Sequence, residues 1–101
     1  MPAATWLELC RAAEAMENHE RAVDEYERLA DAHPAQKESI LALLSAGRLC
    51  LRKLNRPADA LRNYKAAKDS LVPHLDWGTN IAAGIRDAEK ASGVTVAPPV
   101  K

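Results

Sequence analysis

The chain has 101 residues, of which 48% are hydrophobic and 28% are charged, and its formal net charge at pH 7 is zero. This length fits one domain with a modest core, and the composition is typical of a folded globular chain and excludes an intrinsically disordered one. Because the net charge is zero, the chain as a whole exerts no electrostatic attraction on nucleic acid or on an anionic membrane. No apolar run approaches the roughly 18–20 residues that span a bilayer.

The first third of the chain predicts a helical hairpin. Thr5 and Glu8 have the spacing of a capping box, which starts a helix that ends near Met16. Asn18 is a natural N-cap for a second helix, which stops before Pro34. Apolar residues recur at helical spacing in both segments, as Trp6, Leu9, Cys10 and Ala13 in the first and as Ala22, Tyr26, Leu29 and Ala30 in the second.

The rest of the chain predicts three more helices and no paired strand. A long helix covers about 36–54, and Pro57 suits the first turn of the next helix, which ends near Leu71. A fifth helix covers about 75–91, and Ser92-Gly93 supplies its stop. The inward positions of these three helices are Ile40, Leu43, Gly47, Cys50 and Leu54, then Ala60, Leu61, Tyr64 and Ala67, then Trp77, Ile81, Ile85 and Ala88.

The second and fourth predicted helices repeat one pattern, in which an alanine is followed by an aliphatic residue, by a tyrosine four places after the alanine, and later by a proline. This order resembles the tetratricopeptide repeat family, whose helix pair also begins with Trp, then Leu and a small residue three and four places on. The positions in register are Trp6, Leu9, Cys10, Ala22, Tyr26 and Pro34 in the first repeat, and Gly47, Ala60, Tyr64, Ala67 and Pro73 in the second.

The resemblance covers roughly residues 4–91 and has departures. Ala13 stands where the family prefers Tyr, and Leu43 stands where it prefers Trp. The resemblance implies an all-α fold of antiparallel helical hairpins stacked as a short right-handed array of about five helices, with Trp6, Tyr26, Leu43, Tyr64 and Trp77 mostly buried. The expected organisation is a domain over 1–93, with repeats at about 4–34 and 36–73, a capping helix at about 75–91, and a disordered tail at 94–101.

No catalytic or metal-binding pattern occurs in the sequence. His19, His33 and His74 fall near helix ends or in connectors, and Cys10 and Cys50 have no companion cysteine or histidine nearby. We expect both thiols to be small buried hydrophobic groups, with a disulfide or a redox role as the alternative. The glycines of "GTNIAAG" (78–84) lie in or beside an apolar helix and follow no strand, so they form no phosphate loop. We therefore expect no enzymatic activity, no cofactor and no metal site.

Basic residues concentrate in the stretch 47–56, which holds Arg48, Arg52, Lys53 and Arg56. No aromatic residue interleaves with them for base stacking, and acidic residues balance them elsewhere. This stretch therefore indicates no nucleic-acid site. A rim for a protein partner and a plain solvated helix face are the two remaining interpretations.

Tetratricopeptide arrays are protein–protein adaptors, so the resemblance implies an adaptor or scaffold module within a larger protein or assembly. The first helix of each repeat lines a concave groove that holds a peptide or a partner helix. Alternating apolar and guanidinium groups favour a ligand with acidic residues beside an apolar anchor. The positions that fall on the groove by register are Leu7 and Arg11 in the first repeat, and Leu44, Arg48, Leu51 and Arg52 in the second.

Self-association is the alternative function. The third predicted helix is apolar around more than half of its circumference, so an exposed part of it, including Leu44 and Leu51, offers a surface for a second copy. The first residues lack the basic start and apolar block of a signal peptide, and two unpaired thiols fit a reducing compartment. We therefore expect a cytoplasmic protein without membrane insertion.

Overall fold

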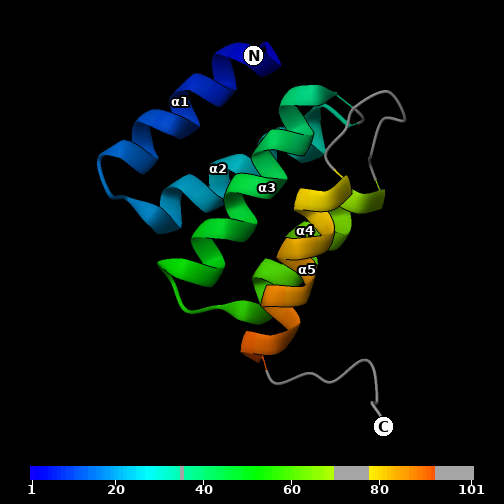
Figure 1. The fold of residues 1–101 in the computed structure, drawn as a ribbon. Helices are drawn as coiled ribbons and strands as arrows, with labels where there is room; N and C mark the ends of the chain where they lie inside the picture. The colour runs from blue at the N-terminus through cyan, green and yellow to red at the C-terminus, as the bar shows by residue number, and fades with distance from the viewer. Residues whose placement is uncertain (35, 70–77, 93–101) are drawn as a thin grey trace, which may run out of the picture.

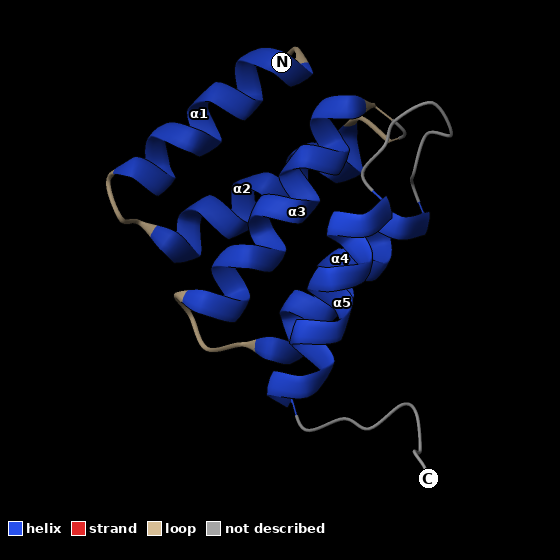
Figure 2. Ribbon diagram, in the orientation of Figure 1, coloured by secondary structure: helices blue, strands red, loops and turns tan. Residues whose placement is uncertain are grey.

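The computed structural model describes residues 1–34, 36–69 and 78–92, and every regular element within them is a helix. The helices are α1 (Ala3–Ala15), α2 (His19–Ala32), α3 (Lys37–Arg52), α4 (Pro57–Asp69) and α5 (Gly78–Ser92). Figure 2 shows these helices without any strand in the described ranges. The prediction of an all-α fold with about five helices is confirmed.

The helices pack as a row of hairpins in two layers. Each helix packs against the next one in the chain, and α3 also contacts α1 and α5. Figure 1 shows α3 in front of α2, α5 in front of α4, and α1 at one edge of the row. One layer therefore consists of α1, α3 and α5, and α3 is the central helix of the fold.

The start of α1 differs from the prediction. The helix begins at Ala3, and the Trp6 backbone N–H donates to the carbonyl oxygen of Pro2 over 2.9 Å. Thr5 therefore lies inside the helix, and the predicted capping box is wrong. Pro2 has a φ of −61°, which the proline ring fixes and which suits entry into a helix. Asn18 is the N-cap residue of α2 as predicted, although its side chain makes no capping hydrogen bond.

The core is built from small aliphatic residues and two tyrosines. Tyr26, Leu43 and Tyr64 are buried, as predicted. Trp6 is only half-buried, because its ring lies at the outer edge of the α1–α2 hairpin and its indole N–H donates to Glu25 Oε1 over 3.0 Å. An indole group pairs an apolar body with a polar N–H that requires a partner, so this edge position satisfies both parts. The fifth predicted core residue, Trp77, lies outside the described residues.

The inward face of α1 also differs from the prediction. Leu7 is 6% exposed and belongs to the core, whereas Leu9, predicted to face inward, is 53% exposed. Ala3, Leu7 and Cys10 recur at helical spacing and are all buried against the fold. A second apolar stripe runs on the exposed side from Leu9 to Met16, the C-cap residue of the same helix. The helix is therefore apolar on two faces, and the structure buries the face through Leu7.

Tyr64 packs between two glycines that belong to different helices. A Cβ atom placed on Gly47 of α3 would lie 2.9 Å from Tyr64 Cζ, and one placed on Gly84 of α5 would lie 2.6 Å from the same atom. Real Cβ atoms essentially never approach a ring so closely. The two glycines therefore provide the space in which the α4 ring joins α3 to α5.

Ala60→Leu is expected to lower the free energy of unfolding by about 1–3 kcal/mol, because the added methylenes must enter a closely packed site. Ala60 is completely buried in the cluster that contains Ala22 and Tyr26. Urea denaturation followed by circular dichroism measures the change. An unchanged stability would mean that the α3–α4 hairpin has spare volume at this position.

Candidate functional site

The face formed by α1 and α3 carries two adjoining hollows, of about 410 and 250 Å³. They share Ser45 and Arg48 and together form one open groove, called the α1–α3 groove below. The lining combines cations, a carboxylate and apolar side chains. The lining residues are Arg11, Glu14, Ala15, Tyr26, Ser45 and Arg48 in the first hollow, and Leu41, Leu44, Ser45, Arg48 and Tyr64 in the second.

The structure brings together three of the six residues predicted for the groove. Arg11, Leu44 and Arg48 line it. Leu7 does not, because it is buried in the core, so the prediction that it lines the groove is wrong. Leu51 is half-buried against the core and Arg52 is exposed, and neither lines the two hollows.

Arg52 nevertheless lies near the second hollow. Burial raises the pKa of the Tyr64 hydroxyl, and the positive charges of Arg52 and Arg48 act against that rise. Both guanidinium groups are therefore close enough to influence the phenol electrostatically. The apolar end of the groove has two cations beside it.

A hydrogen-bonded carboxylate joins three helices at the base of the first hollow. The buried Tyr26 hydroxyl donates to Glu14 Oε1 over 2.8 Å, and Arg48 Nη2 donates to Glu14 Oε2 over 2.8 Å. Burial of Glu14 opposes its ionisation, but the hydrogen bonds from Arg48 and Tyr26 outweigh burial, and the pKa of Glu14 lies below its ordinary value. Burial and the neighbouring Glu14 carboxylate raise the pKa of Tyr26, so the hydroxyl stays protonated and remains a donor.

Glu14→Gln is expected to lower the free energy of unfolding by about 1 kcal/mol at pH 7, because it removes the charge that Arg48 and Tyr26 stabilise. A carboxylate whose folded pKa is depressed contributes stability above its unfolded pKa and loses it as the pH falls through the folded pKa. The difference between wild type and variant should therefore shrink below about pH 4.5, the ordinary value for this carboxyl. Urea denaturation at pH 7 and pH 3 measures both values.

Glu8→Gln is the matched control, since Glu8 is an exposed carboxylate of the same helix with no hydrogen-bond or ion-pair partner in the described residues. It should leave stability nearly unchanged at both pH values. An equal loss in the two variants would mean that the contacts of Glu14 do not stabilise the fold.

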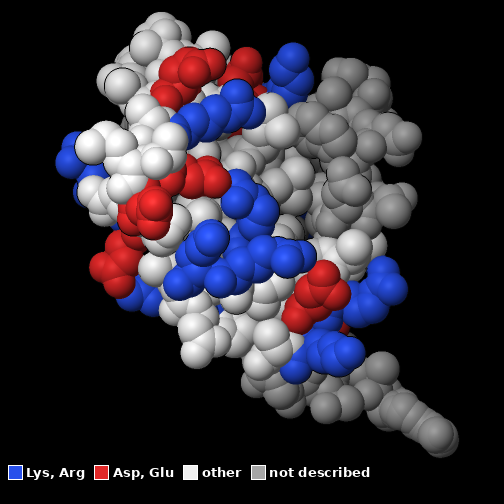
Figure 3. All heavy atoms as spheres, turned by 60° about the vertical axis from the view of Figure 1, so that its left-hand side comes forward, with Lys and Arg blue, Asp and Glu red and all other residues white. Residues whose placement is uncertain are grey.

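Two of the three arginines of the basic stretch are paired with carboxylates. Arg48 bonds Glu14, and Arg56 Nη2 donates to Glu20 Oε2 over 2.7 Å. Figure 3 shows Lys and Arg gathered in the middle of one side of the molecule with Asp and Glu beside them. By contrast, Arg11 and Arg52 form no ion pair with any described residue. Arg11 in the groove and Arg52 beside it are therefore available to bind a carboxylate of a ligand.

No large apolar side chain of α3 is fully exposed, which weakens the idea of a self-association surface there. Leu44 and Leu51 are half-buried and pack against the core, as do Leu41 and Leu54 near the two ends of that helix. The large apolar side chains that are exposed in the described residues are Met1, Leu9 and Met16. They lie instead on the α1–α2 hairpin.

The described residues bring no three His, Cys, Asp or Glu side chains together in a way that could hold a metal ion. His33 Nε2 lies 2.9 Å from the Met1 carbonyl oxygen, and His74 is outside the described residues. Cys10 and Cys50 are buried free thiols, which confirms their prediction as small buried groups. Burial raises the pKa of each thiol to about 11, so both are protonated near neutral pH.

Among the described helices, none has the length and apolar character needed to cross a membrane.

These features define the chain as a helical repeat-like domain with an open, mixed apolar and charged groove. It belongs to the bacterial transcriptional activator domain family, whose model matches residues 3–90. A search of the curated proteins and a search of the solved structures found no significant match to the chain.

Proposed function

We propose that the chain is a non-enzymatic protein–protein interaction module of a bacterial transcriptional regulator, acting in the cytoplasm as part of a larger protein or assembly. Its family places it among transcriptional activator domains, and the α1–α3 groove gives it a surface for a segment of a partner protein. We further propose that its hairpins are tetratricopeptide-type repeats. The complete burial of Ala22 and Ala60, each followed by a buried tyrosine four residues later, supports that assignment.

The main support for the proposal is the chemistry of the α1–α3 groove. Leu41 and Leu44 offer apolar surface in one hollow, beside the buried Tyr64 ring. Arg11, which forms no ion pair within the described part of the chain, borders the other hollow, and Arg52 lies beside the apolar end. An arginine fork recognises carboxylates well, and apolar surface provides a desolvated anchor position. The proposed ligand is an extended or helical segment with acidic residues beside one apolar anchor.

A protein ligand is favoured over nucleic acid for this domain. The formal net charge of the chain is zero, and Arg48 and Arg56 are neutralised by Glu14 and Glu20. A phosphate backbone carries a charge at every nucleotide and would have to pass Glu14, whereas a peptide can place its few acidic residues beside Arg11 and Arg52 and away from Glu14. The aromatic rings of the α1–α3 groove, Tyr26 and Tyr64, are buried and cannot stack on bases.

A selection of displayed random peptides on the folded domain tests the proposal. The expected result is enrichment of peptides that carry Asp or Glu on both sides of a large apolar residue. A selection that yields no enriched class, or that enriches basic peptides, would contradict it. Binding of a double-stranded oligonucleotide at physiological salt, with no peptide enriched, would favour nucleic-acid recognition instead.

A further inference from the structure

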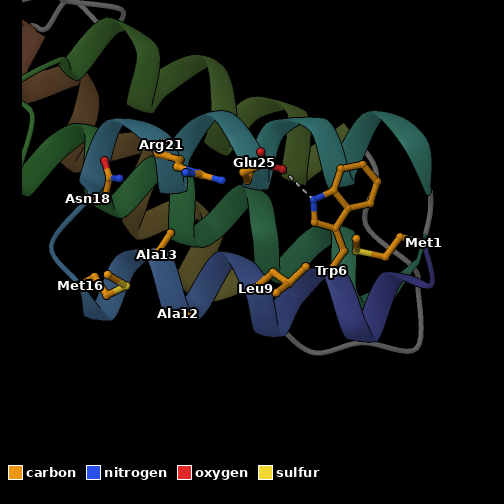
Figure 4. A pocket seen from close by; sticks show the side chains of 9 residues that line it. All are labelled: Met1, Trp6, Leu9, Ala12, Ala13, Met16, Asn18, Arg21 and Glu25. Atoms are coloured by element: carbon orange, nitrogen blue, oxygen red, sulfur yellow. Dashed lines mark hydrogen bonds between the residues drawn. The ribbon is translucent and has the colours of Figure 1, made fainter.

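The second apolar stripe of α1 forms one wall of a cleft between α1 and α2. The cleft has a volume of about 590 Å³ and holds all the exposed large apolar side chains of the described residues, with Met1 65%, Leu9 53% and Met16 81% exposed. Figure 4 shows it from Met1 and Trp6 at one end to Met16 and Asn18 at the other, with Arg21 and Glu25 of α2 along the opposite wall. We call it the α1–α2 cleft.

This cleft is on the side of the first hairpin that no described helix covers. The other side of the hairpin packs against α3, which lies behind α1 and α2 in Figure 4. Exposed apolar side chains scattered singly need no explanation, but a contiguous group in a hollow indicates a contact surface. The α1–α3 groove is a separate surface, so an occupant of the cleft does not compete with the proposed ligand.

The order of residues along the stripe is symmetric. Leu9, Ala12, Ala13 and Met16 follow one another at spacings of three, one and three, with large side chains outside and small ones at the centre. An antiparallel copy of α1 placed across this centre would set Leu9 against Met16 of the second copy. The alanines would then meet at the crossing point, where small residues let two helices approach closely.

We propose that the α1–α2 cleft is a homodimer interface, in which two copies of α1 pack antiparallel about a two-fold axis near Ala12 and Ala13. A two-fold contact uses the same patch on both copies, which is what a symmetric stripe allows. Methionine adapts its flexible side chain to irregular hollows and packs well on aromatic rings, so Met16 of one copy suits the end of the cleft near Trp6 of the other.

The charges of the cleft also fit a second copy. Among the side chains that line it, Arg21 is the cation and Glu25 is the carboxylate, whose Oε1 accepts the Trp6 indole hydrogen bond. The side-chain charges of two such linings cancel when they meet, and each copy offers an arginine to the carboxylate of the other. A ligand that carries several charges of one sign would be attracted less strongly by this lining.

Sedimentation equilibrium of the whole chain from about 1 µM to about 1 mM tests the proposal, since weak dimers have dissociation constants within this range. The expected mass rises with concentration toward twice the single-chain value of 11.0 kDa. Leu9→Glu should raise the dissociation constant at least about tenfold, because it replaces the largest aliphatic side chain of the apolar contact with a charged one. Ala82→Glu, the same charge change at an exposed site of α5, should leave it unchanged.

Disulfide trapping tests the antiparallel register. Leu9→Cys and Met16→Cys chains, mixed and oxidised, should form a cross-linked pair, whereas each variant alone should cross-link poorly. The wild type should not cross-link, because Cys10 and Cys50 are buried. A single-chain mass at every concentration would overturn the proposal, and the cleft would then be a contact surface for a different protein. A dimer that Leu9→Glu does not weaken, or that cross-links through Leu9→Cys alone, would also overturn it.

Discussion

Gly84→Leu is expected to lower the free energy of unfolding by about 3 kcal/mol, although leucine is a far better helix former than glycine. The Cβ of any residue at this position would lie 2.6 Å from Tyr64 Cζ, and the remaining leucine atoms would need still more space. Gly84→Ala should also destabilise the fold, whereas helix propensity alone predicts a gain of about 1 kcal/mol. Thermal and urea denaturation measure the sign as well as the size.

Two further variants isolate the cause. Ala82→Leu on the exposed side of α5 should stay within about 0.5 kcal/mol of wild type, because Ala82 is exposed to solvent. Removing the ring with Tyr64→Leu should reduce the cost of Gly84→Ala, and the difference is the coupling free energy of the pair. If Gly84→Ala raises the stability, the ring does not occupy this space and the packing of α4 on α5 is wrong.

Reversing the charge of Arg11 in the groove and of Arg52 beside it, as Arg11→Glu with Arg52→Glu, is expected to lower the affinity for a selected acidic peptide by about ten- to a hundredfold. Both side chains are exposed and neither forms an ion pair in the described residues, so helicity and melting temperature should change little. Titration calorimetry measures the affinity. The loss should shrink as salt is raised, because screening already weakens the wild-type attraction.

The control is the pair Lys65→Glu with Lys68→Glu, which makes the same change in charge on exposed positions of α4. Equal losses of affinity in the two double variants would mean that net charge, and not the α1–α3 groove, governs binding. Arg48→Glu is a poorer probe than the sequence indicates. It would place a second carboxylate against Glu14, so it would alter stability and binding together.

The sequence predicted the helices and the buried tyrosines because these depend on local periodicity. A period of 3.6 residues, together with Asn18 and Pro57 near helix starts, is enough to find four of the five elements to within a few residues. The fifth helix, predicted over about 75–91, is observed as Gly78–Ser92, and residues 75–77 of the prediction are outside the described part of the chain.

The inward face of α1 could not be predicted in the same way. Leu7 and Leu9 lie on two apolar stripes of one helix, and periodicity alone does not decide which stripe meets the core. The role of Gly84 depends on the Tyr64 ring, which belongs to another helix. The ion pair of Arg48 depends on Glu14, which lies 34 residues away in the sequence. Contacts of this kind follow from tertiary packing and leave no local pattern.

The most direct test of the proposed function is a backbone-amide NMR titration of the labelled domain with a peptide enriched by selection. The largest changes in chemical shift are expected on residues of the α1–α3 groove, such as Arg11, Leu44, Ser45 and Arg48. Changes confined to the α1–α2 cleft around Leu9 and Met16, or to the exposed side of α4, would contradict the proposed function.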